Sequence, residues 1–359
     1  MTKAPFIPNC PVCGAAGSRV VYDALTDQLF GAQGSWTLVQ CVATGCGLYR
    51  LHPIPTAEEL ASAYANYYTH EAKGNGARRG GRLRAAYGEL VSGYLRHRFG
   101  YPYSVTRGHW GALWPLLYLA PLRRAGLERS LMWLPFAGPQ RLLDVGCGSG
   151  EWLERMKALG WNVEGIDPDA EAVLAARKTG CQAQCGTLPD IAYPSGHFDV
   201  VSMNHVIEHV PDPLGTLREC LRILRPGGQL VLATPNGASW GHRLFGARWR
   251  GLEPPRHLHL FGCRSMERLL QAAGFVRPYV RTYAARSVVE ESISPPFRGQ
   301  APKMGALRRR VVRSLSWALT AVEHVLLALY PRAGECIFAH AAKPSRQSES
   351  LCRPESCTA

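Results

Sequence analysis

Residues 141–281 alternate between short apolar segments and amphipathic segments, and this alternation constrains the fold more than any other feature. Segments with the composition of buried strands are Arg141–Val145, Asn162–Ile166, Phe198–Met203 and Gln229–Ala233. Segments with helical character lie between them at Glu151–Leu159, Ala170–Lys178 and 214–224. Strands that alternate with short helices indicate βαβ units. The sequence therefore predicts a doubly wound α/β fold with a mostly parallel sheet covered on both faces.

A glycine-rich loop follows the first predicted strand and reads Asp144-Val-Gly146-Cys147-Gly148-Ser-Gly150. Glycines at this position permit a tight turn and the close approach of a ligand to the N-terminus of the next helix. Asp167 ends the next predicted strand, where an acid can accept hydrogen bonds from both hydroxyls of a ribose. The loop and the acid together predict a nucleoside-binding site.

The spacing of the loop distinguishes between nucleoside classes. A dinucleotide loop prefers a third glycine three residues after Gly148, where this chain has Glu151. The loop resembles the S-adenosylmethionine (SAM) loop of class I SAM-dependent methyltransferases of the type 11/23 kind. Later segments resemble the same class in order: Gly165–Asp169, Phe198–Val201, Asn204–Val210, Leu224–Gly228 and Leu230–Asn236.

This resemblance implies a Rossmann-like open sheet of seven strands, with SAM bound at the carboxyl ends of the first two. The residues that it places at the cofactor are Asp144, Gly146, Cys147, Gly148, Gly150, Asp167, Pro168, Thr187, Leu188 and Asn204. Among these, Asp167 would hold the ribose, and the segment at Thr187 and Leu188 would border the adenine.

Two cysteine pairs lie near the N-terminus, Cys10 with Cys13 and Cys41 with Cys46. Four thiolates in two close pairs can bind zinc tetrahedrally, and such a zinc is structural because no coordination position stays open. The segment resembles the N-terminal zinc ribbons of some bacterial methyltransferases, including those of sugar and cell-surface glycan pathways. The alternative is four unrelated core cysteines.

The first candidate for the chemistry follows the predicted strand Phe198–Met203. His205, Glu208 and His209 would share one face if their segment were helical, and they could bind a divalent metal or supply a base. The segment resembles the E-x-x-E-H pattern of quinone-pathway O-methyltransferases, with His205 in place of the first glutamate. This replacement disfavours Mg²⁺, which prefers oxygen ligands. A structural or cofactor-proximal role for these residues is the alternative.

The second candidate is the segment Glu253–Phe261, which lies where this fold places its acceptor. In an extended segment, His257 and His259 would point to opposite sides, and one of them could act as a base or contact the substrate. Arg256 could hold an anionic group of the acceptor. Hydrogen-bonded structural histidines are the alternative.

The predicted organisation has six parts. They are a zinc-ribbon-like segment at 1–52, a helical linker or lid at 53–139, a SAM-binding core at 140–286, a basic amphipathic helical insertion at 287–333, a final core strand at 334–343 and a disordered tail at 344–359. The formal net charge is +14, and the basic residues concentrate at 73–110, 243–256 and 303–313. Such stretches favour an anionic partner.

These observations predict a methyltransferase that transfers a methyl group in line to a hydroxyl of a small or lipid-linked acceptor, such as a sugar, glycan or quinone-like ring. We read no secretory signal and no uninterrupted apolar segment of membrane-spanning length, which predicts a cytoplasmic protein. The basic amphipathic segment at 308–330 suggests peripheral contact with the inner face of the membrane. An RNA methyltransferase and a non-catalytic SAM-fold binding protein are the alternatives, and Met203–Val206 lacks the motif typical of base-methylating enzymes.

Overall fold

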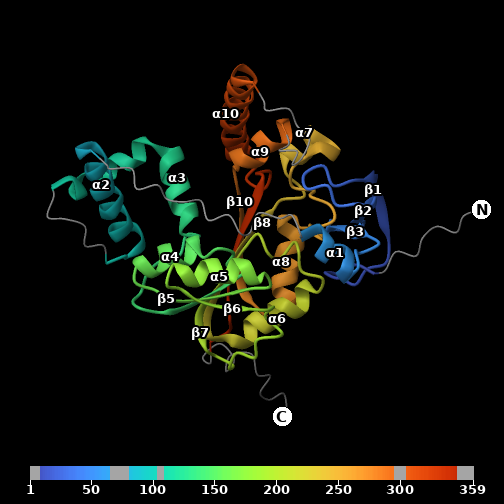
Figure 1. Cartoon of the computed structure of the whole chain (residues 1–359), viewed down its shortest axis with the longest axis horizontal. Coiled ribbons are helices and arrows are strands. Elements are labelled where there is room, and N and C mark those ends of the chain that lie inside the picture. Colours follow the sequence, from blue (N-terminus) through green and yellow to red (C-terminus); the bar gives the residue numbers. More distant parts are fainter. Residues whose placement is uncertain (1–8, 65–80, 103–108, 295–304, 346–359) are drawn as a thin grey trace, which may run out of the picture. The chain divides into compact units, whose positions relative to one another are not determined.

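The computed structural model describes residues 9–64, 81–102, 109–294 and 305–345, and it divides into two compact units (Figure 1). The first unit comprises residues 1–68, 193–196 and 203–359, and the second comprises 69–192 and 197–202. These boundaries differ from the six predicted parts because the N-terminal segment and the residues after 203 form one unit.

The second unit contains the first strands of the main sheet and the helices that accompany them. Its strands are β4 (Arg141–Val145), β5 (Asn162–Asp167) and β6 (Gln182–Cys185), with most of β7 (Phe198–Asn204). Its helices are α2 (Arg82–Phe99), the 3₁₀ helix η2 (His109–Leu119), α3 (Pro121–Ser130), α4 (Glu151–Ala158) and α5 (Ala170–Lys178). Strand β5 pairs in parallel with β4 and with β6. Leu142, Leu143 and Ile166 are buried, as expected for strands covered on both faces.

The first unit contains a small N-terminal sheet, the remaining strands of the main sheet and the C-terminal helices. Its strands are β1 (Ser18–Leu25), β2 (Trp36–Cys41), β3 (Tyr49–His52), β8 (Leu224–Pro235), β9 (His259–Leu260), β10 (Val276–Tyr283) and β11 (Cys336–Ala342). Its helices are α1 (Ala57–Tyr64), α6 (Pro213–Ile223), α7 (Trp240–Phe245), η3 (Gly246–Arg248), α8 (Cys263–Ala272), α9 (Arg286–Ile293) and α10 (Ala306–Leu329).

The main sheet has seven strands in the order β10-β11-β8-β7-β4-β5-β6. The order reverses after β4, as in a doubly wound sheet, and β11 runs antiparallel to both β8 and β10. The predicted fold class is confirmed. The predicted helix over 214–224 ends at Ile223, and Arg225–Gly228, expected to form a turn, instead lies within β8.

The small sheet has the order β1-β2-β3-β9, so its last strand comes from the segment that follows β8. Arg50 of β3 pairs with His259 of β9. A buried apolar cluster connects this sheet to the loop before β9, and its members are Leu25, Trp36, Leu38, Leu51, Trp249, Leu252 and Leu260. The loop at 249–258 therefore packs against the sheet of the N-terminal segment.

The C-terminal insertion contains one long helix, α10, which ends before Pro331 as predicted. Among the described residues, this is the one helix long and apolar enough to cross a membrane by length and composition, with a mean hydropathy of 1.3. No membrane-spanning segment was expected from the sequence, because Arg and Glu interrupt the apolar residues of this helix. Most of the predicted disordered tail, residues 346–359, lies outside the described residues.

Candidate functional site

The glycine loop joins β4 to α4 through three residues with positive φ. Gly146, Gly148 and Gly150 have φ values of 73°, 53° and 78°, a region that side chains disfavour. The amides of Gly146 and Cys147 donate to the Ile166 carbonyl at 2.7 and 3.0 Å, which fastens the loop to the end of β5. At Gly150, a Cβ atom would lie 2.8 Å from the Cβ of Ala176. At Gly148, nothing lies within 4 Å of that position, so the loop leaves open space there.

Two buried carboxylates flank this loop. Asp167 ends β5 and accepts hydrogen bonds from the amides of Gly148 at 2.8 Å and Asp169 at 2.9 Å. Asp144 accepts a hydrogen bond of 2.7 Å from the Ser202 hydroxyl. Burial raises the pKa of Asp144 to about 7; the bond from Ser202 opposes this shift and the charge of Asp167 adds to it.

The other predicted cofactor residues have differing surroundings. The Cys147 side chain is buried against Gly165, where a Cβ would lie 2.7 Å from its Sγ, so only its backbone can face a ligand. The Thr187 hydroxyl donates to Asp190 at 2.5 Å, and Leu188 is buried. Pro168 and Asn204 are exposed. Their roles at a cofactor stay predictions.

The four N-terminal cysteines converge. The Sγ atoms of Cys10 and Cys46 are 3.7 Å apart, as are those of Cys13 and Cys41. The ligand atoms of all four lie within 4.8 Å of one another. A tetrahedral zinc with Zn–S bonds of about 2.3 Å requires sulfur separations of about 3.8 Å. The four thiols therefore fit a zinc ion. The two cysteine pairs, with two and four residues between their members, lie together as the zinc-ribbon prediction requires.

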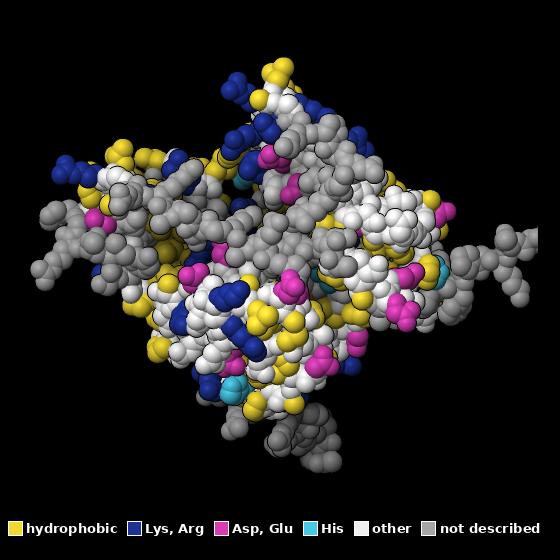
Figure 2. Space-filling model, viewed as in Figure 1, with side chains coloured by type: hydrophobic (Ala, Val, Ile, Leu, Met, Phe, Trp, Pro, Cys, Tyr) yellow, Lys and Arg dark blue, Asp and Glu magenta, His cyan; other side chains and the backbone are white. Residues whose placement is uncertain are grey.

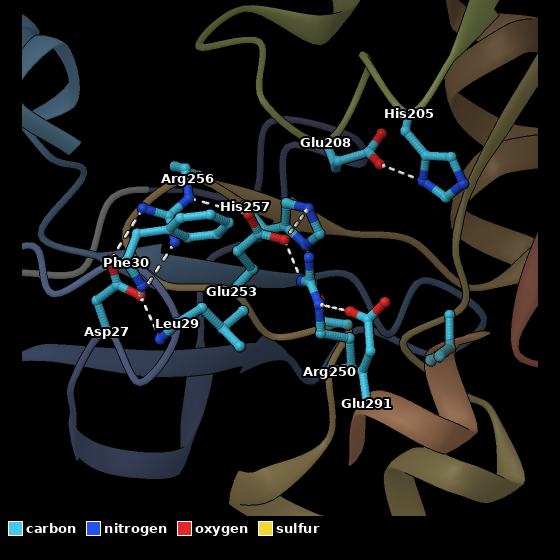
Figure 3. Close-up of polar contacts among 12 residues, drawn as sticks. Asp27, Leu29, Phe30, His205, Glu208, Arg250, Glu253, Arg256, His257 and Glu291 are labelled. Atoms are coloured by element: carbon cyan, nitrogen blue, oxygen red, sulfur yellow. Dashed lines mark hydrogen bonds and ion pairs between the residues drawn. The ribbon is translucent and has the colours of Figure 1, made fainter. Parts of the chain in front are cut away.

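His205, Glu208 and His209 do not lie on a helix, so the condition under which they would share a helix face is not met. These residues form a turn after β7, and His205 has a φ of 58°, which breaks the strand and excludes a helix there. The Nδ1 atom of His205 still lies 3.0 Å from Oε1 of Glu208 (Figure 3). The Thr234 hydroxyl of β8 donates to the other oxygen of Glu208 at 2.9 Å.

A group of three side chains, Glu208, His209 and His257, forms the most distinctive arrangement in the first unit, and we call it the Glu-His-His cluster. Their ligand atoms lie within 4.8 Å of one another. His257 thus takes the place that the sequence analysis gave to His205. The cluster is buried apart from His209, which is partly exposed.

Hydrogen bonds orient both imidazoles of the Glu-His-His cluster. The Nδ1 atom of His257 lies 2.7 Å from the Gly251 carbonyl. Because a carbonyl only accepts, this Nδ1 carries hydrogen and Nε2 is the accepting atom of neutral His257. The Nδ1 atom of His209 lies 3.0 Å from the Arg256 carbonyl and 2.8 Å from the Tyr64 hydroxyl oxygen, so these two groups hold the ring in place.

Glu208 and His257 have different charge states at neutral pH. Burial opposes ionisation of Glu208, but the hydrogen bond from His205 and the nearby imidazoles outweigh it and lower the pKa to about 2. Burial lowers the pKa of His257 to about 4. At neutral pH the cluster therefore offers one carboxylate and a neutral His257, which is a set of donors for a proton or a divalent cation.

The loop that carries His257 is held by buried ion pairs, drawn in Figure 3. The guanidinium of Arg256 contacts both oxygens of Asp27, at 2.9 and 3.0 Å, and donates to Glu253 at 2.9 Å. It also stacks on the Phe30 ring, 4.2 Å from its centroid. Arg250 contacts Glu253 and also Glu291, the latter at 2.6 Å. The predicted contact of Arg256 with an anionic acceptor does not fit, because this fully buried side chain is already paired with two carboxylates.

His259 lies in β9 and is also buried. Burial lowers its pKa to about 4, and its Nδ1 atom has no hydrogen-bond partner among the described residues. His257 precedes the strand, so the predicted alternation along one extended segment is not observed. His259 lies outside the Glu-His-His cluster.

Two contributors were missed by sequence reasoning. Asp27 pairs with Arg256, and it also accepts from the amides of Leu29, Phe30 and Ala32 at 2.9, 3.1 and 3.0 Å. Tyr64 contacts His209 from α1. The pattern Asp-x-Leu is a signal for a turn, but no local pattern identifies a partner more than 200 residues away.

A doubly wound seven-stranded sheet, a glycine loop after its first parallel strand and a carboxylate at the end of the next are the features that the resemblance to class I SAM-dependent methyltransferases predicted. Residues 118–277 match a family model described as a methyltransferase domain. The predicted resemblance is thus confirmed for this domain.

Comparison with known proteins gives more specific similarities. The chain is 38% identical over 154 residues to a ubiquinone biosynthesis O-methyltransferase of Xanthomonas oryzae pv. oryzae, across 40% of this chain and 63% of that protein. It is 40% identical over 124 residues to the protein of the same name from Cereibacter sphaeroides, across 32% of this chain and 50% of that protein. The chain therefore spans less than two thirds of the length of these relatives.

Among solved structures, one similar chain is a SAM-dependent methyltransferase from Archaeoglobus fulgidus. It is 19% identical, with a TM-score of 0.42, and the match covers 62% of this chain and 94% of that chain.

Proposed function

We propose that this protein transfers a methyl group from SAM to a hydroxyl oxygen of a quinone-like acceptor. The observation that carries the proposal is the Glu-His-His cluster, which supplies proton or metal chemistry in a chain with a SAM-type glycine loop. The relatives named as ubiquinone biosynthesis O-methyltransferases support this acceptor class.

Residues of the second unit would hold SAM. The open space at Gly148 and the buried carboxylate of Asp167 beside it fit a nucleoside at the carboxyl ends of β4 and β5. Bound SAM supplies an electrophilic methyl carbon, so the protein must orient the acceptor and remove its proton.

Within the Glu-His-His cluster, His209 is the residue suited to accept that proton. It is the partly exposed member, and its Nδ1 contacts the Arg256 carbonyl and the Tyr64 hydroxyl, so we assign the accepting role to Nε2. The ionised Glu208 stabilises the imidazolium that results. His257 stays neutral and supports the cluster from the loop.

The same three donors also fit a divalent cation. Two imidazoles and one carboxylate suit zinc, iron or cobalt better than magnesium, which prefers oxygen ligands. A cation held there would acidify the acceptor hydroxyl. At the N-terminus, Cys10, Cys13, Cys41 and Cys46 would hold a separate structural zinc.

Titration calorimetry with SAM tests the cofactor assignment. Asp167→Ala should weaken binding at least tenfold because it removes the acceptor for the ribose hydroxyls. Glu154→Gln, an exposed change on α4, should leave binding as in the wild type. Equal affinities in all three proteins would move the cofactor elsewhere.

Transfer of radiolabelled methyl from SAM tests the reaction. The acceptors are a phenolic quinone precursor, a glycan and RNA, each assayed separately. We expect label in the quinone precursor, lost by about 100-fold in His209→Asn, since a positioned base typically contributes at least that factor. Label in RNA alone, or undiminished activity in His209→Asn, would contradict the proposal.

Metal analysis distinguishes the two chemistries of the Glu-His-His cluster. If a cation takes part, His257→Ala lowers the metal content of the protein below that of the wild type. If His209 acts alone, His257→Ala leaves the metal content unchanged, because the cysteines hold their zinc in both proteins.

A further inference from the structure

Helix α10 is oriented with a mostly polar face inward and an apolar face outward. Its buried residues Val312, Ser316, Thr320 and Glu323 lie at spacings of four, four and three, on one face of the helix. The opposite face carries an apolar stripe, whose members are Leu307, Val311, Leu315, Ala318, Val322, Val325 and Leu329. Leu307, Val325 and Leu329 are 76%, 64% and 70% exposed, so this stripe is not a core face.

Specific contacts hold the inner face against the rest of the first unit. The Ser316 hydroxyl lies 3.5 Å from Glu290 of α9, and the backbone amide of Glu335 donates to Glu323 at 2.8 Å. Glu323 and Glu335 are fully buried. Rotating the helix to hide its apolar stripe would expose these polar contacts and break them. The outward direction of the stripe is therefore fixed by the fold.

An exposed apolar stripe of this length is costly in water, so a partner is required to cover it. The charges of the helix indicate which kind. Arg308, Arg309, Arg310 and Arg313 are exposed at its first turns, and its one acidic residue, Glu323, is buried. Figure 2 shows dark blue and yellow side chains together on the part that Figure 1 labels α10.

We propose that α10 docks this face on an anionic membrane surface, with the apolar stripe in the interface and the arginines on lipid phosphates. Basic residues that flank an apolar helix face match anionic lipid in both charge and chemistry. A second copy of this chain fits less well, because its α10 offers no exposed acid to pair with the arginines.

The helix lies on the surface rather than across it. Its inner face is tied to α9 and to Glu335, and β11 begins at the next residue, Cys336, within the main sheet. A spanning helix would have to leave these contacts and bury Glu323 in hydrocarbon. Surface docking keeps every contact of the inner face.

Vesicle sedimentation of the full chain tests this proposal independently of any methyl transfer. The vesicles contain phosphatidylcholine alone or with about 30 mol% phosphatidylglycerol. We expect binding to the anionic vesicles that weakens as salt rises. Arg308→Gln with Arg310→Gln, which lie on either side of the apolar stripe, should reduce it roughly 30-fold, since each basic residue near an anionic surface strengthens binding about fivefold.

The apolar stripe is tested by Val311→Gln with Val325→Gln and Leu329→Gln, which should abolish sedimentation. Leu174→Gln with Arg218→Gln, on α5 and α6, is the matched control and should sediment as the wild type does. Circular dichroism verifies that each variant is folded.

Three results would overturn the proposal. One is equal binding by the stripe variant and the wild type. Another is a wild-type dimer that becomes monomeric in the stripe variant while neither protein binds vesicles, because the occupant is then a second copy. The third is retention in vesicles after an alkaline carbonate wash, which indicates a spanning helix.

Discussion

Buried carboxylates at the ends of strands determine much of the chemistry at the residue scale. Asp144 is enclosed at the end of β4 with one hydroxyl partner, and burial raises its pKa to about 7. Asp167 ends the neighbouring strand with two backbone amides bound. The two acids therefore differ in their hydrogen-bond environments, although both lie at the end of a β-strand.

The pKa of Asp144 makes stability depend on pH. Its folded pKa lies above its unfolded value, so the folded state binds more protons between about pH 4 and 7 and stability falls as pH rises through that window. The full effect is of the order of 4 kcal/mol. Asp144→Asn should flatten this slope while keeping an acceptor for Ser202. Urea unfolding at several pH values measures it, and an unchanged slope in the variant would refute the assignment.

Arg256 gives a second prediction at this scale. Arg256→Met leaves Asp27 buried without its cation and leaves Glu253 with Arg250 alone, so it should destabilise the protein by about 3–5 kcal/mol. Adding Asp27→Asn should restore part of that loss, since it removes one uncompensated charge. Denaturant unfolding of the single and double variants checks this. Purely additive losses would mean that the pair does not interact.

At the scale of elements, the sequence predicted periodicity well and orientation poorly. Strands β4, β5 and β7 and helix α5 lie where apolar spacing placed them, whereas β8 begins five residues before the predicted strand and β6 and β10 were not predicted. At His205 the i, i+3, i+4 spacing allowed a helix, because spacing does not reveal a positive φ. For α10, periodicity located two faces, but only contacts from α9 and Glu335 decide which one turns inward. The Glu-His-His cluster was half predicted, because His257 joins it through tertiary structure.

A glycine substitution at the junction of β4 and α4 tests how tightly the glycine loop packs. Gly150→Ala places a Cβ 2.8 Å from Ala176 at a φ of 78°, so it should cost about 2–4 kcal/mol through both strain and collision. Gly227→Ala has a similar φ of 75° but nothing within 4 Å, so it should cost only about 1 kcal/mol. Thermal or urea unfolding compares the two. Equal losses of stability in the two variants would show that α4 can move away from α5 at no cost.

At the scale of the whole molecule, the N-terminal segment is part of the unit that carries the Glu-His-His cluster. Its sheet shares an apolar cluster with Trp249 and Leu252, and Asp27 pairs with Arg256 beside His257. Composition and spacing predicted a separate ribbon, because neither shows that β9 joins its sheet. One of the three basic stretches, residues 303–313, includes the first turns of α10.

Removing the zinc tests whether the N-terminal sheet supports the loop at 249–258. Elemental analysis should give about one zinc per chain at the cysteines, and Cys10→Ala with Cys13→Ala should lose it. Because the sheet supports the loop at 249–258, the same variant should also lower methyl transfer while leaving SAM affinity intact. Protein purified without zinc that is fully folded would contradict the structural role.

The pairing of Arg50 with His259 also affects how the chain is made. A ribosome that adds 5–20 residues per second needs roughly 10–40 s to synthesise the stretch between these two partners. During that interval the nascent N-terminal sheet has an unpaired edge at β3, and Asp27 has no guanidinium to neutralise it. Early capture of a metal ion by the four thiols would hold these strands together until the closing strand is translated.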